Sequence, residues 1–126
     1  MNKNIALYNK YFGNTGFDRL HLFETVRDAY SLKSAIYPGS FVHITPAFVF
    51  PITAFIDNDK RVQGFFEDPA VLAMVTDKKQ YLEKPSIFAV QQSYNLKADI
   101  KDGSFDLMIS QYAGFVSQTC KRYLKI

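Results

Sequence analysis

Residues 34–60, SAIYPGSFVHITPAFVFPITAFIDNDK, constrain the fold more than any other part of the chain. A short apolar run ends in a Pro-Gly-Ser turn, and a second short apolar run ends in Asp-Asn-Asp. Short apolar runs bounded by turn signals are typical of strands that are buried on both faces. Between them, ITPAFVF predicts a brief helix with Thr45 as its cap and Pro46 as its first residue. We therefore expect a strand–helix–strand unit here.

The rest of the chain continues this alternation. Helical spacing is present over 17–33, over DKRVQGFF, from Asp68 onwards and over the last segment, AGFVSQTCKRYLK. SIFAVQQ and FDLMIS are the third and fourth predicted strands. Alternating strands and helices predict an α/β fold: a doubly wound, mostly parallel sheet of about four strands, with helices on both faces. Residues 1–16 are expected to be irregular or weakly helical, and 17–126 to form the domain.

Composition limits the classes of function. The 126 residues suit one domain, and the formal net charge of +3 is small, so nucleic acid is not indicated as a partner. Cys120 is the single cysteine, which excludes an internal disulfide, and its helical spacing suggests a core position. The polar start does not resemble a signal peptide, and no apolar run has the length of a membrane span. We expect a soluble, cytoplasmic protein with no membrane partner.

Small or polar residues follow each predicted strand. They are Tyr37, Pro38, Gly39 and Ser40 after the first strand, Asp57 and Asp59 at the end of the second, Gln92, Ser93 and Tyr94 after the third, and Ser110, Gln111 and Tyr112 after the fourth. In doubly wound sheets, ligands bind beyond the carboxyl ends of the strands, where the strand order reverses. Glycine lets the backbone approach a ligand, and a carboxylate ending the second strand can accept both hydroxyls of a ribose. The pattern therefore predicts a nucleotide-type crevice.

Structural roles compete with these ligand-binding roles. The Pro-Gly sequence fits an ordinary turn equally well, and Asp57 or Asp59 fits a cap of the following helix equally well. A packing role is favoured for Tyr112, and a satisfied structural role for His43. The sequence contains no zinc-ligand spacing, nucleophile elbow or phosphate-binding loop, and we expect no metal.

The order and spacing of AIYPGS, AFIDNDKR, FAVQQSYN and FDLMISQYAGF resemble class I S-adenosylmethionine-dependent methyltransferases over about residues 17–126. The resemblance implies a Rossmann-like domain with the strand order 3-2-1-4 and with S-adenosylmethionine at the carboxyl ends of the strands. By position, Gly39 lies under the methionine part of the cofactor, Asp57 binds the ribose, Ser93 contacts adenine and Ser110 lies beside the methyl donor. The rest of the expected cofactor-binding set is Tyr37, Pro38, Ser40, Asp59, Gln92 and Tyr94, and Gln111 and Tyr112 lie on the substrate side. The sequence does not name the methyl acceptor.

Two features depart from the family pattern. The loop YPGSF holds one glycine where the family has two or three, and four strands are present where the family has seven. The resemblance then implies a domain truncated after the fourth strand, with that strand's open edge covered by a second copy or another partner chain. One alternative is a catalytically inactive relative that acts as an interaction or assembly module. A nicotinamide dinucleotide binder is disfavoured because G-x-G-x-x-G is absent.

Overall fold

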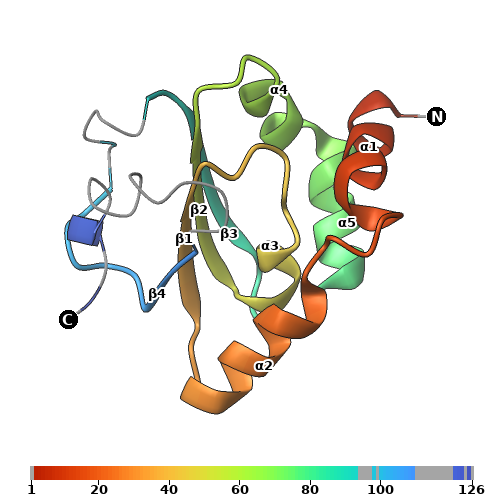
Figure 1. The fold of residues 1–126 in the computed structure, drawn as a ribbon. Helices are drawn as coiled ribbons and strands as arrows, with labels where there is room; N and C mark the ends of the chain where they lie inside the picture. Colours follow the sequence, from red (N-terminus) through yellow and green to blue (C-terminus); the bar gives the residue numbers. More distant parts are fainter. Residues whose placement is uncertain (1, 94–97, 99, 110–120, 124, 126) are drawn as a thin grey trace.

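The computed structural model describes residues 2–93, 98, 100–109, 121–123 and 125, and these form an α/β fold around a parallel sheet (Figure 1). Its strands are β1 (Ser34–Pro38), β2 (Ile52–Asp57), β3 (Ser86–Gln91) and β4 (Leu107–Met108). The strand order is β3-β2-β1-β4, and every pairing is parallel. The predicted fold class and strand order are therefore confirmed.

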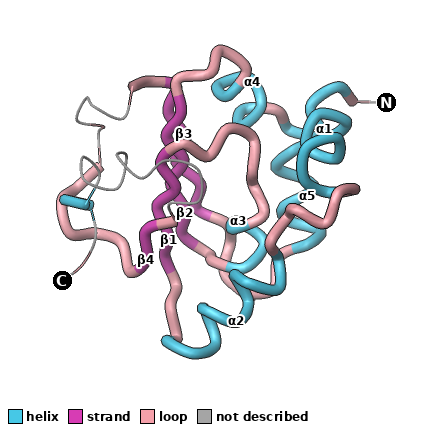
Figure 2. The backbone as a smooth tube through the Cα atoms, in the orientation of Figure 1, coloured by secondary structure: helices cyan, strands magenta, loops and turns pink. Residues whose placement is uncertain are grey.

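The α-helices among the described residues pack on one face of the sheet (Figure 1, Figure 2). They are α1 (Lys3–Tyr8), α2 (Leu20–Tyr30), α3 (Pro46–Val49), α4 (Val62–Glu67) and α5 (Pro69–Lys78), and a π-helical turn, η1 (Asn9–Gly13), continues α1. Alternate strand residues such as Tyr37 and Phe55 face this helical layer, because successive strand side chains point to opposite faces. The main core lies between the helices and the sheet.

The second face of the sheet has a different cover. Ile36, Ala54 and Ile56 pack there against Ala98, Ile100, Phe105 and Tyr123, the last of which lies in a 3₁₀ turn, η2 (Lys121–Tyr123). The amide of Phe105 donates to the carbonyl of Tyr123 at 2.9 Å, which ties the two segments together. Most of the helix predicted for the last segment falls on residues outside the described part of the chain. Since the chain runs outward from β1 to β3 and returns to the other side of β1, the strand order reverses between β1 and β4.

The N-terminal segment, which was expected to be irregular or weakly helical, forms α1 and η1 and enters the core. The Asn2 side chain caps α1 by accepting hydrogen bonds from two amides of the first turn. Tyr8 and Phe12 are buried, and the Tyr8 hydroxyl lies 2.7 Å from Oγ1 of Thr45. Thr45 precedes α3 as predicted, but its hydroxyl bonds with Tyr8 and makes no cap hydrogen bond. This contact fixes the segment above the loop that follows β1.

Candidate functional site

The loop after β1 is joined to the end of β2 by two hydrogen bonds. The amide of Gly39 donates to the carbonyl of Ile56 at 2.7 Å, and the amide of Phe41 donates to Oδ2 of Asp57 at 2.8 Å. Gly39 has a φ of 73°, which is a left-handed conformation that glycine adopts without strain. Phe41 has a φ of 49°, which is unusual for a residue with a side chain. The loop therefore depends on the Asp57 carboxylate to hold its shape.

Asp57 connects the ends of three neighbouring segments. Besides the amide of Phe41, its carboxylate accepts the amide of Asp59 at 2.8 Å through Oδ1. Its carbonyl accepts the amide of Gln92, just after β3, at 3.0 Å. Each carboxylate oxygen keeps a second lone pair with which it can accept a further hydrogen bond. The structure thus brings the predicted residues Gly39, Asp57, Asp59 and Gln92 to one end of the sheet.

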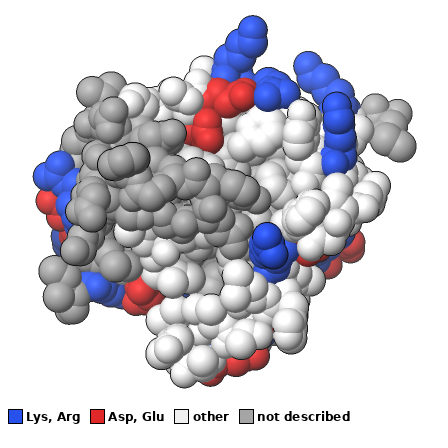
Figure 3. Space-filling model, in the orientation of Figure 1, with Lys and Arg blue, Asp and Glu red and all other residues white. Residues whose placement is uncertain are grey.

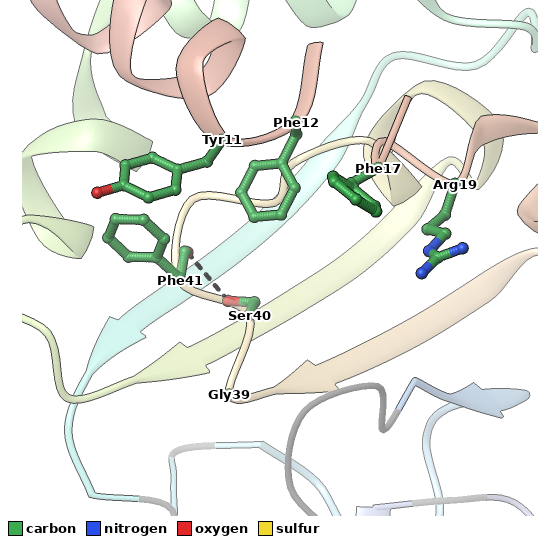
Figure 4. Close-up of a pocket in the computed structure, with 7 residues that line it drawn as sticks. All are labelled: Tyr11, Phe12, Phe17, Arg19, Gly39, Ser40 and Phe41. Atoms are coloured by element: carbon green, nitrogen blue, oxygen red, sulfur yellow. Dashed lines mark hydrogen bonds between the residues drawn. The ribbon is translucent and has the colours of Figure 1, made fainter. Parts of the chain in front are cut away.

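A hollow of ≈ 530 Å³ opens over the loop after β1, and we call it the aromatic hollow (Figure 4). It is lined by Tyr11, Phe12, Phe17, Arg19, Gly39, Ser40 and Phe41. Four of these residues come from the N-terminal segment and the loop before α2, so two parts of the chain far apart in sequence build it. The rings of Tyr11 and Phe41 meet edge to face, with 5.4 Å between their centroids. The hollow therefore has aromatic walls and a floor of backbone.

Cations lie over three of the aromatic rings at this end of the molecule. They are Lys10 over Tyr11 at 5.4 Å, Arg19 over Phe17 at 5.8 Å and Arg61 over Phe41 at 4.6 Å. Arg61 also forms two contacts of 3.0 Å with the carboxylate of Asp59. This hydrogen-bonded pair lowers the pKa of Asp59 and raises that of Arg61. Asp59 is therefore engaged by its own neighbour and not directed into the aromatic hollow.

Below the loop, the side chain of Tyr37 lies in the buried core. Its hydroxyl is 2.8 Å from Nδ1 of His43, and Nε2 of His43 is 2.7 Å from the carbonyl oxygen of Asp18. A carbonyl can only accept, so Nε2 carries the proton and Nδ1 accepts from Tyr37. Burial lowers the pKa of His43 to about 4, which keeps the ring neutral at pH 7. The ring of Phe12 stacks on it at 4.2 Å, so His43 has the structural role that the sequence favoured.

Of the other predicted site residues, some lie in or beside β1 and β3, and some lie outside the described part of the chain. Pro38 is the buried last residue of β1, and the buried Ser40 donates through Oγ to the carbonyl of Phe41 at 3.2 Å. The strand β3 ends at Gln91, and Gln92 and then Ser93 follow it. The predictions for Tyr94, Ser110, Gln111 and Tyr112 lie outside the described residues. The structure therefore describes the predicted site residues after β1 and β2, and it describes Gln92 and Ser93 after β3.

The residues of the aromatic hollow that precede β1 were not among those predicted from the sequence. Tyr11 and Phe12 lie in residues 1–16, which were expected to be irregular or weakly helical, and Phe17 and Arg19 lie at the start of the helix expected over 17–33. A signal was present, because Ile5, Tyr8 and Phe12 recur at spacings of three and four residues. That spacing predicts an amphipathic helix, which could have pointed to a packed N-terminal segment.

Comparison of the chain with models of known protein families, with curated proteins and with solved structures finds no match. The features that bear on the function of this chain are therefore the parallel sheet and the aromatic hollow. Among the residues that the structure describes, no three His, Cys, Asp or Glu side chains gather as metal ligands would. No helix in that part of the chain has the length and apolar character needed to cross a bilayer.

Proposed function

We propose that this chain is an S-adenosylmethionine-dependent methyltransferase-like domain that binds its adenosine cofactor in the aromatic hollow. One observation carries the proposal. The aromatic hollow lies over the loop that follows the carboxyl end of β1, and β1 is the strand at which the strand order reverses. Doubly wound sheets bind their ligands at this point, because the loops on either side diverge there and leave a crevice.

The residues at the aromatic hollow fit the chemistry of this cofactor. The rings of Tyr11 and Phe41 offer faces and edges for adenine, and the guanidinium of Arg19 offers an ion pair to the carboxylate of the methionine part. Asp57 does not itself line the aromatic hollow, but its carboxylate accepts the amide of Phe41, which does, and it has lone pairs left for ribose hydroxyls. The cofactor, when bound, supplies a methyl group on a sulfonium.

The protein's contribution to methyl transfer is chiefly positioning. The described residues that line the aromatic hollow include no histidine, carboxylate or lysine, which are side chains that commonly serve as general bases. The aromatic walls would hold the two reactants in a fixed orientation. The domain therefore suits an acceptor atom that is nucleophilic without help from a base.

A second candidate is an inactive relative that serves as an interaction or assembly module. It is favoured by the two backbone amides that already occupy the Asp57 carboxylate, since this residue has a sufficient structural role without a ligand. This candidate predicts that no adenosine cofactor binds and that the chain associates with itself or with another protein.

Thermal unfolding with S-adenosylhomocysteine, S-adenosylmethionine and NAD tests the proposal. At 100 times the dissociation constant, a bound ligand adds about 2.7 kcal/mol to the free energy of unfolding. We expect the melting temperature to rise by several degrees with the first two ligands and not with NAD. Arg19→Asn should weaken binding about tenfold, because it removes one charged hydrogen-bonding partner. Arg19 has a φ of 60°, which asparagine tolerates well, so the variant should fold.

The matched control is Lys101→Asn, which removes the same charge from an exposed position on the segment covering the other face. It should leave the ligand-induced shift unchanged. If neither adenosylated ligand raises the melting temperature, the cofactor proposal is wrong and the inactive module is favoured. A rise with NAD alone would support a dinucleotide binder.

A further inference from the structure

A second hollow, of ≈ 580 Å³, lies between α1 and the start of α4, and we call it the basic hollow. It is lined by Lys3, Asn4, Leu7, Lys60, Arg61 and Gly64. Figure 3 shows lysine and arginine side chains gathered beside α1 and α4 around an area of uncharged surface. Three cations from two distant parts of the sequence therefore meet at one concave surface.

The cations of the basic hollow are only partly neutralised. Arg61 is paired with Asp59, but in the part of the chain that the structure describes no carboxylate lies within ion-pair distance of Lys3 or Lys60. The carboxylates of Asp68 and Asp59 act on Lys3 and Lys60, respectively, from beyond that distance. The nearby carboxylate of Asp68 accepts the side-chain amides of Asn2 and Asn4, at 3.1 and 2.8 Å, and caps α5. Like charges held together raise each other's energy, and a bound anion relieves this repulsion.

We propose that the basic hollow binds the phosphate group of a second ligand, which, resting on the proposed function, is the methyl acceptor. A phosphate monoester carries about −1.5 to −2 charges at pH 7, opposite in sign to the three cationic side chains of the basic hollow, of which only Arg61 forms an ion pair. The volume is much larger than a single phosphate requires and lies in the range of organic ligand sites. The phosphate is therefore carried on a larger molecule, part of which packs on Leu7.

Arg61 connects the basic hollow to the aromatic hollow. Its guanidinium lies 4.6 Å from the ring centroid of Phe41, and Phe41 lines the aromatic hollow. The two hollows are therefore neighbours, because Arg61 lines one, Phe41 lines the other and these two side chains are in contact. This geometry fits an acceptor held at one end by charge while its other end reaches the methyl group.

Gly64 provides the sharpest test of the basic hollow. A Cβ built on Gly64 meets nothing within 4 Å, and this residue is exposed on α4, so larger side chains fit there. Gly64→Glu places a negative charge in the basic hollow, and Gly64→Gln adds the same bulk without the charge. Both residues form helices better than glycine, so both variants should fold. Ala73→Glu, on the exposed side of α5, controls for the change in net charge.

Calorimetry at low and high salt measures the binding of three probes. They are inorganic phosphate, uridine 5′-monophosphate and a ten-nucleotide single-stranded oligouridylate. We expect the wild-type chain to bind the monophosphate, Gly64→Glu to weaken binding at least tenfold more than Gly64→Gln, and Ala73→Glu to have no effect. Equal affinity for monophosphate and oligonucleotide indicates a small phosphorylated acceptor, whereas tenfold tighter, salt-sensitive binding of the oligonucleotide indicates a nucleic-acid strand. Either result supports the phosphate site.

The proposal is overturned if none of the three probes binds, or if Gly64→Glu and Gly64→Gln weaken binding equally. Its failure can be told apart from failure of the cofactor proposal. Gly64 lies outside the aromatic hollow, so Gly64→Glu should retain binding of S-adenosylhomocysteine. Arg19→Asn, conversely, should retain binding of the monophosphate.

Discussion

At the scale of the residue, Asp57 holds the candidate site together. Its two carboxylate oxygens accept amides from the loops after β1 and β2, and one of those amides belongs to Phe41 in a left-handed conformation. A conformation of this kind costs about 1–3 kcal/mol and persists only where the surroundings impose it. Asp57 supplies that constraint, whether or not a ligand is bound.

Replacing Asp57 should therefore destabilise the protein before any ligand is considered. We expect Asp57→Ala to lower the free energy of unfolding by about 2–4 kcal/mol, because two amides lose a charged acceptor. Asp57→Asn keeps one carbonyl oxygen and should lose about half as much. Urea denaturation measures both, with the exposed Asp77→Ala as a control expected within about 0.5 kcal/mol of wild type. A change for Asp57→Ala as small as the control's would refute this role.

His43 should make stability depend on pH. Its pKa is about 4 in the folded protein, below the ordinary value of 6.5, because burial penalises the charged ring. Between these values the unfolded chain binds the proton and the folded chain does not, so stability falls as pH falls from about 6.5 to about 4. The full loss is about 3 kcal/mol. Urea denaturation at intervals of half a pH unit measures it.

The matched variants for this pH dependence are His43→Gln and His21→Gln. The first removes the buried ring and should flatten the slope between pH 6.5 and 4, although it will be less stable at pH 7. The second removes an exposed histidine and should keep the wild-type slope. Equal slopes for wild type and His43→Gln would show that another group causes the pH dependence.

At the scale of the element, short helices position the site. The helix α1 contributes Tyr8, and the turn that follows it contributes Phe12, which stacks on His43 below the aromatic hollow. The brief α4 carries Gly64 on its exposed side, where no neighbouring atom requires a glycine. Glycine inside a helix costs backbone entropy, so α4 is less stable than it would be with alanine at position 64.

Gly64→Ala should raise the free energy of unfolding by about 0.5–1 kcal/mol, because alanine loses less conformational freedom in a helix. Gly103→Ala is the contrasting variant. Gly103 also has open space around it, but its φ is +68°, so alanine there is strained and should destabilise the protein. Thermal unfolding of the two variants distinguishes these effects. A melting temperature of Gly64→Ala below that of wild type would contradict this view of α4.

Helices and strands could be predicted from the sequence where a short stretch of residues marks them. The strands β1, β2 and β3 follow short apolar runs with turn residues at their ends, and Asp68-Pro69 marks the start of α5. The aromatic hollow was not predictable in the same way, because it forms where residues 11–19 meet the loop at 39–41. That contact depends on tertiary packing, through bonds such as Tyr8 to Thr45, which no short window of sequence contains.

At the scale of the whole molecule, the sheet ends at β3 on one side and at β4 on the other. In the described part of the chain, β4 pairs with β1 through Leu107 and Met108 and has no other strand partner. Unpaired strand edges favour association with another chain. We expect a homodimer or a partner chain to cover the edge of β4, as the sequence analysis proposed.

Light scattering over a range of protein concentrations tests this association. The expected mass rises with concentration from the monomer value of 14.4 kDa towards twice that value. A constant mass of one chain at every concentration would exclude self-association and leave only a different partner for the β4 edge.

The central claim is that an adenosine cofactor binds over the carboxyl end of β1, and amide NMR spectra of the ¹⁵N-labelled chain test it most directly. Titration with S-adenosylhomocysteine should shift the amide signals of Gly39, Phe41 and Asp59. The amides of Gly103 and Phe105, on the other face of the sheet, should stay in place. Unchanged spectra at a large excess of ligand, or shifts confined to that other face, would contradict the claim.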